Sequence, residues 1–207
     1  MTAILYYVHD PMCSWCWGGA PVLEQLLENL PADIQLTRLL GGLAPDSDQP
    51  MPAALRQTIE ATWHRIQQSI PGTQFNFDFW TQCVPRRSSW PACRAVIAAR
   101  MQGDVFDVRM TKAIQLAYYT QARNPSDDST LMELSDELGL DTQLFATALA
   151  GESVQQQLQA EIALSRQLHA SSFPSLVLKT GNSVWPIALD YNDSAPMLEM
   201  IAGLHVE

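Results

Sequence analysis

The sequence is poor in basic residues and contains no long apolar run. Lys and Arg together number 12 against 22 Asp and Glu, which gives a formal net charge of −10. Such an acidic chain does not favour nucleic acid or anionic membrane surfaces, because both attract cationic protein surfaces. Its apolar stretches fall well short of the roughly 20 residues that a membrane-spanning helix needs. We therefore expect neither nucleic acid nor membrane among its partners.

The N-terminus lacks the features of a secretory signal. Met1-Thr2-Ala3 leads directly into an apolar, strand-like run, without a basic region or a small-residue cleavage site. We therefore expect a cytoplasmic protein, and structural disulfides are rare in that compartment. Cysteine is also scarce, since four Cys in 207 residues do not make a disulfide scaffold. Cys83 and Cys93 are expected to be free thiols, and Cys93 shares a helical face with apolar residues, which indicates a core position.

The other two cysteines lie close together in the segment Cys13-Ser14-Trp15-Cys16. The segment follows the strand-like run Ile4–Val8 and precedes a helical pattern from Trp17 to Leu30. This order places both sulfurs at a helix N-terminus, where unpaired N–H groups and the helix dipole favour a thiolate. Such sites lower a cysteine pKa from about 8.5 to roughly 3.5–7.5. The motif therefore indicates thiol–disulfide exchange, with Cys13 as an accessible nucleophile and Cys16 as the resolving thiol.

The rest of the chain predicts an α/β fold. Apolar patterning predicts strands at Ile4–Val8, Ile34–Leu40, Ser175–Lys179 and Ser183–Ala188. After a Pro/Asp/Ser-rich linker at Asp46–Pro52, helices are expected at 53–69, 90–102, 104–122, 127–138 and 141–150. Further helices are expected at 152–169 and 194–204. This order predicts a mixed central sheet flanked by helices, divided into a sheet domain (1–45 and 151–207) and a helical insertion (46–150).

In this organisation the chain resembles the DsbA-like branch of the thioredoxin superfamily, a thioredoxin fold interrupted by an α-helical insertion. The resemblance rests on the block from Asp10 to Gly18 (DPMCSWCWG), on Pro21 and on Phe173-Pro174. The block is similar to that of signal-less, cytoplasmic members described as predicted protein-disulfide isomerases. The resemblance implies a thiol–disulfide oxidoreductase of the isomerase or reductase type, with catalytic Cys13, Cys16 and Pro174. It also implies a cis peptide bond before Pro174, which would face the two cysteines.

Two features depart from the thioredoxin pattern. Thioredoxins bury a carboxylate six residues before the first cysteine, and Tyr7 occupies that place here. His9, if protonated, and Asp10 are candidates to modulate the thiolate, although His9 is equally well explained as an ordinary hydrogen-bonded loop residue. The intervening Ser14-Trp15 matches neither thioredoxin nor the strong oxidants, so the reduction potential and the direction of electron flow stay open.

The resemblance also indicates how a partner would bind. An extended segment of the partner is expected beside Pro174 and the backbone of Phe173, with Ser172 in the same loop. Trp15 is expected to form an apolar docking rim, whereas Trp17 is expected to pack in the core. The partner is expected to be a disulfide-containing protein or small molecule. No bound cofactor is implied; glutathione is a candidate co-substrate, and a thioredoxin or glutathione system would regenerate the pair.

Two alternatives remain. The kappa-type glutathione transferases and the 2-hydroxychromene-2-carboxylate isomerases share this architecture and often have Ser at the first position, where it activates glutathione. Cysteine at both positions here argues against that reaction. The other alternative is a non-catalytic module whose thiols pack or bind a metal. A structural zinc site usually needs four ligands in two close pairs, and the chain offers one such pair, so no metal is predicted.

Overall fold

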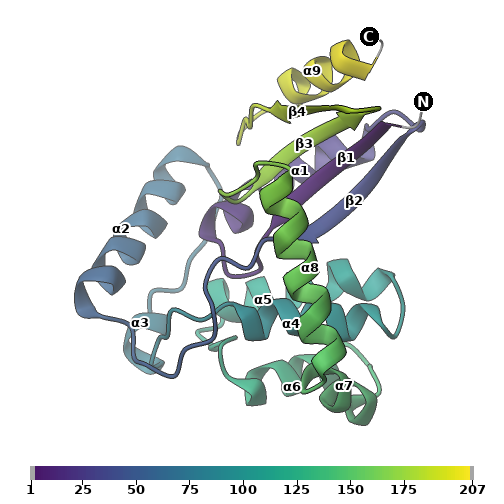
Figure 1. Cartoon of the computed structure of the whole chain (residues 1–207). Helices are drawn as coiled ribbons and strands as arrows, with labels where there is room; N and C mark the ends of the chain where they lie inside the picture. Colours follow the sequence, from purple (N-terminus) through teal and green to yellow (C-terminus); the bar gives the residue numbers. More distant parts are fainter. Residues whose placement is uncertain (1–2, 206–207) are drawn as a thin grey trace.

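A four-stranded sheet forms the centre of the fold in this computed structural model, which describes residues 3–205 (Figure 1). Met1 and Thr2, on which part of the signal-peptide expectation rests, lie outside the described residues. The strand order is β2-β1-β3-β4. The strands are β1 (Ala3–His9), β2 (Ile34–Leu40), β3 (Ser175–Thr180) and β4 (Ser183–Ile187). β1 pairs parallel with β2 and antiparallel with β3, and β3 pairs antiparallel with β4, which confirms the predicted mixed sheet.

The alternation of β1 directs side chains to two buried faces of the sheet. On one face, Leu5 and Tyr7 pack in a cluster that includes Leu26 of α1 (Ser14–Glu28) and Ile201 of α9 (Ala195–His205). On the other face, side chains of β1 pack against Leu168, which directly follows α8 (Glu152–Gln167). Helices therefore cover both faces, as the predicted fold class requires.

The remaining helices lie together beyond the ends of β1 and β2 (Figure 1). Between β2 and α8, the structure has α2 (Ala53–Ser69), α3 (Phe79–Gln82), α4 (Trp90–Arg100), α5 (Val105–Thr120), α6 (Asp128–Glu137) and α7 (Thr142–Leu149). The largest cluster of buried side chains lies here and centres on aromatic residues. Trp63 is fully buried, and its ring lies 4.7–4.8 Å from the rings of Phe75 and Trp80.

Two differences from the sequence-based expectation exceed one or two residues at the end of an element. α1 begins at Ser14 rather than at Trp17, so Cys13 takes the N-cap position and Cys16 lies in the first turn. The four-residue α3 was not predicted, because a single helical turn is too short to show an apolar period. No helix within residues 3–205 combines the length and the apolar character that a membrane span requires.

The aromatic cluster predicts a large difference between two equivalent substitutions. Trp63→Ala should lower the free energy of unfolding by about 3–5 kcal/mol, because it leaves a cavity in the core. Trp185→Ala removes the same side chain from β4, where Trp185 is 40% exposed, and should cost about 0.5 kcal/mol or less. Urea denaturation of both variants provides the measurement, and equal losses would contradict this description of the core.

Candidate active site

The Cys-x-x-Cys segment connects the end of β1 to the start of α1. A tight turn precedes it, in which the backbone N–H of Cys13 donates to the carbonyl of Asp10 at 3.0 Å. The carbonyl of Cys13 then accepts from the N–H of Trp17 at 3.1 Å, which starts the helix. Cys13 and Cys16, like Cys83 and Cys93, are free thiols. The two sulfurs therefore lie at the helix N-terminus, where the sequence placed them.

The two cysteines are both buried but differ in their surroundings. Cys13 is 6% exposed and its Sγ donates to the carbonyl of Phe173 at 3.2 Å, whereas Cys16 is 1% exposed. Burial raises the pKa of the Cys16 thiol well above its ordinary value, and a hydrogen bond to Cys13 and the charge on that residue raise it further. Cys16 is thus held as a thiol, which suits a resolving residue. Cys13 is therefore more buried than the sequence analysis expected for an attacking nucleophile.

The loop before β3 lies against the cysteines. The Phe173–Pro174 peptide bond is cis, the isomer that the resemblance implies. Pro174 is buried and lines one small cavity with Cys16. The ring of Phe173 lies so close to Gly41 that a Cβ added there would be 2.0 Å from a ring carbon. The side chain of Ser172 is exposed, and its carbonyl accepts from the hydroxyl of Ser175 at 2.6 Å.

Trp15 forms part of an aromatic surface beside the cysteines. It is half-buried, its ring centroid lies 5.0 Å from that of Tyr191, and the Arg65 guanidinium lies 5.5 Å above it. Tyr191 packs over Gly19 of α1 and lines the cavity that contains Cys16. No sequence pattern marks Tyr191, because only the fold brings this post-β4 loop to the start of α1. Trp17 is half-buried against the insertion core, and its indole N–H donates to the carbonyl of Gln74 at 3.0 Å.

Asp10 is fully buried, and its carboxylate ties the cysteine turn to other loops. One oxygen accepts from the N–H of Met12 at 2.8 Å. The other accepts from the N–H of Leu43 and the hydroxyl of Ser89, both at 2.7 Å, and from the thiol of Cys93 at 3.3 Å. Burial raises the pKa of Asp10, and these hydrogen bonds oppose the rise. Cys93 is fully buried in the insertion core, where its helical face predicted it.

His9 lies on the same face of β1 as Tyr7. Its ring stacks on Tyr7 with centroids 4.8 Å apart, and its Nε2 lies 3.4 Å from a guanidinium nitrogen of Arg38. Burial lowers the pKa of His9 well below its ordinary value, and the positive charges of Arg38 and Arg100 lower it further. His9 is therefore a neutral imidazole near pH 7.

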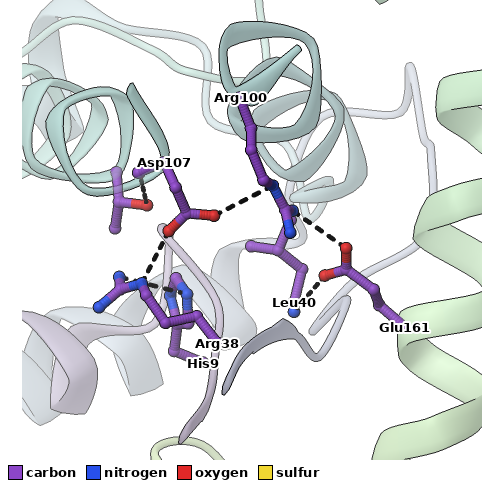
Figure 2. Close-up of polar contacts among 7 residues, drawn as sticks. His9, Arg38, Leu40, Arg100, Asp107 and Glu161 are labelled. Carbon is purple, nitrogen blue, oxygen red and sulfur yellow. Dashed lines mark hydrogen bonds and ion pairs between the residues drawn. The ribbon is translucent and has the colours of Figure 1, made fainter. Parts of the chain in front are cut away.

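Arg38 begins a network of charged side chains that joins the sheet to three helices (Figure 2). Arg38 pairs with Asp107 of α5 at 2.7 Å, and Asp107 pairs with Arg100 of α4 at 3.2 Å. Arg100 pairs with Glu161 of α8 at 3.0 Å, and Glu161 accepts from the backbone N–H of Leu40 at 2.8 Å. No local sequence pattern marks this network, because its members are far apart along the chain. Among residues 3–205, no group of three or more His, Cys, Asp or Glu is arranged to hold a metal ion.

Comparison with known proteins agrees with this geometry. A family model described as Thioredoxin matches residues 6–185. Among curated proteins, the ClpXP adapter protein SpxH of Bacillus subtilis is 23% identical over 173 residues, which cover 83% of this chain and 56% of that protein. The chain thus spans little more than half the length of that relative.

Solved structures match over almost the whole chain. A candidate protein disulfide isomerase from Nitrosomonas europaea has a TM-score of 0.83 and 26% identity, covering 98% of this chain and 97% of that one. The cytosolic disulfide reductase DsbM from Pseudomonas aeruginosa, solved with GSH, has a TM-score of 0.73 and 26% identity, covering 98% of each chain. Because the family model covers most of the sequence and the fold carries the helical insertion, the chain belongs to the thioredoxin family, in its DsbA-like branch.

Proposed function

We propose that the protein is a thiol–disulfide oxidoreductase of the protein-disulfide isomerase or reductase type. The observation that carries this proposal is the pair of free thiols at the start of α1, with Cys13 at the N-cap, Cys16 in the first turn and Pro174 beside Cys16. Their positions at the N-cap and in the first turn of the same helix favour ring closure between them over two independent packing roles. The likeness to DsbM and to a candidate disulfide isomerase supports the same chemistry.

In the reducing direction, the reaction has two exchange steps. The Cys13 thiolate attacks one sulfur of a partner disulfide; the S–S bond breaks, a mixed disulfide forms, and the other partner sulfur leaves as a thiolate that takes up a proton. Cys16 then loses its proton and attacks Cys13 Sγ, which releases the second partner sulfur and closes the Cys13–Cys16 disulfide. Two electrons pass from the cysteine pair to the partner, and the reverse sequence oxidises a dithiol.

The surroundings of the pair suit an extended disulfide partner. The Phe173 carbonyl, which now accepts from the Cys13 thiol, would lose this hydrogen bond when Cys13 reacts and would become free to accept from a partner N–H. Trp15 and Tyr191 offer an apolar edge, and Arg65 adds a positive charge beside it. Ser172, directly before Phe173 in the loop that precedes β3, is exposed.

Glutathione is the small-molecule candidate for this site. DsbM has been solved with GSH, and the same thiol chemistry accepts glutathione disulfide as a substrate or glutathione as a reductant. A thioredoxin system would serve equally to recycle the pair. We propose no bound cofactor, and the likeness to the cytosolic reductase DsbM supports a cytoplasmic location.

Cysteine replacement tests the proposal directly. Cys13→Ser should reduce glutathione disulfide turnover to the uncatalysed rate, because it removes the attacking sulfur. Cys16→Ser should retain the first attack and accumulate a mixed disulfide with glutathione on Cys13, detected by intact-protein mass spectrometry.

Cys83→Ser is the matched control. Its thiol donates to the carbonyl of Ala122 at 3.0 Å, and a serine hydroxyl can keep that hydrogen bond, so turnover should be unchanged. If Cys13→Ser retained full activity, the redox assignment would fail. A parent protein without turnover, together with partner binding that survives loss of both Cys13 and Cys16, would instead favour a non-catalytic role. The likeness to the ClpXP adapter protein SpxH makes an adapter the natural candidate for that role.

A further inference from the structure

Tyr7 lies where its side chain can act on the second cysteine. It is 4% exposed, packs on the α1 face of the sheet, and lines one small cavity with Cys16, Pro174 and Tyr191. Burial raises the pKa of Tyr7 well above its ordinary value, and the charge of Cys16 and a hydrogen bond to Cys16 raise it further, while the charge of Arg38 opposes the rise. Tyr7 is therefore a protonated phenol near neutral pH, in the wall of the cavity that Cys16 also lines.

Two residues contact the ring of Tyr7. The His9 imidazole stacks on it with an interplanar angle of 7°, and the Arg38 guanidinium lies 5.1 Å from the ring centroid. Arg38 is in turn fixed by Asp107 at 2.7 Å, and Asp107 by Arg100 (Figure 2). These contacts restrict the ring, so the position of its hydroxyl oxygen is set before any partner binds.

The resolving step creates a charge where water has little access. Cys16 is 1% exposed, and it must become a thiolate before it can attack Cys13. Burial disfavours that charge, and a hydrogen-bond donor aimed at the sulfur is the kind of group that offsets the cost. Tyr7 can supply such a donor because it lines the same cavity as Cys16, whereas the polar contact of the neutral His9 is with Arg38.

We propose that the Tyr7 hydroxyl donates a hydrogen bond to Cys16 and stabilises the thiolate that forms there during the resolving step. Tyr7 keeps its own proton throughout. The proton of Cys16 ends on the departing partner sulfur, the Cys13–partner S–S bond breaks, and the Cys13–Cys16 S–S bond forms. Arg38 and His9 are positioning residues that act through the Tyr7 ring. This inference rests on the proposed function, because it requires a mixed disulfide on Cys13.

Tyr7→Phe tests the proposal because it removes the hydroxyl and keeps the ring contacts. With glutathione disulfide as the probe, acid-quenched samples and mass spectrometry give the rates of mixed-disulfide formation and of its resolution. Formation should stay within about twofold of the parent rate. Resolution should slow on the order of tenfold to a hundredfold, the usual effect of losing a hydrogen bond to a charged group. The half-maximal pH of resolution should also rise, since the Cys16 thiolate loses a donor.

Tyr6→Phe is the matched control. Tyr6 is the neighbouring tyrosine of β1, it is also buried, and it packs on the opposite face of the sheet. Its substitution should leave the rate and pH profile of resolution unchanged. A Tyr7→Phe protein that resolves at the parent rate across the pH range would overturn the role of Tyr7 alone. A parent protein that never forms the Cys13 mixed disulfide would overturn the proposed function as well.

Fluorotyrosine at position 7 provides a second test if Tyr7→Phe folds poorly. Fluorine lowers the pKa of the phenol and strengthens its hydrogen-bond donation with little change in volume. The half-maximal pH of resolution should then move down, opposite to the Tyr7→Phe shift. A fluorotyrosine protein with the parent pH profile would contradict the proposal.

Discussion

The buried carboxylate of Asp10 is the interaction on which the site depends. A fully buried acid needs several hydrogen-bond donors, and here they come from the cysteine turn, the loop after β2 and the residues around the start of α4. The same residue supplies the carbonyl that holds Cys13 at the start of α1. Sheet and helical insertion are therefore joined at the point where the two sulfurs lie, so the site forms when both parts have folded.

A second set of polar contacts joins the sheet to the helices, and it begins at Arg38 of β2. The network from Arg38 to Glu161 crosses between the sheet and helices α4, α5 and α8 (Figure 2). Buried ion pairs contribute little net stability, because desolvation offsets their attraction. Their effect here is geometric: Arg38 is placed over Tyr7, and Tyr7 lines one cavity with Cys16. Sheet and insertion are thus joined near the cysteines through Asp10, and beside Tyr7 through the ion pair of Arg38 with Asp107.

Local signals in the sequence predicted most of the framework. The bounds of β2 and α2 were predicted as observed, because each element has a clear apolar period and each follows a segment that lacks one. The Cys-x-x-Cys pair and the Phe173-Pro174 loop were found from their motifs. The start of α1 was placed three residues late, because the pattern showed the apolar face of the helix and not its N-cap.

Features that depend on long-range contacts could not be predicted in this way. Tyr191 packs against Trp15, although the two residues lie near opposite ends of the sequence. The ion pairs of Arg100 join side chains on three different helices, which no pattern within one helix can relate. Tyr7 was recognised as a departure from the thioredoxin pattern, but its contacts with Arg38 and Cys16 appear only in the folded chain. The hydrogen bond from the Cys13 thiol to the Phe173 carbonyl likewise joins residues 160 positions apart, so no local pattern describes it.

The most direct test of the redox assignment is an equilibrium titration of the protein against mixtures of reduced and oxidised glutathione. Each sample would be acid-quenched, alkylated under denaturing conditions and analysed by peptide mass spectrometry. We expect Cys13 and Cys16 to lose alkylation together in one two-electron transition, while Cys83 and Cys93 stay alkylated throughout. A Cys16 that remained a thiol at every ratio while Cys13 was oxidised would contradict the account.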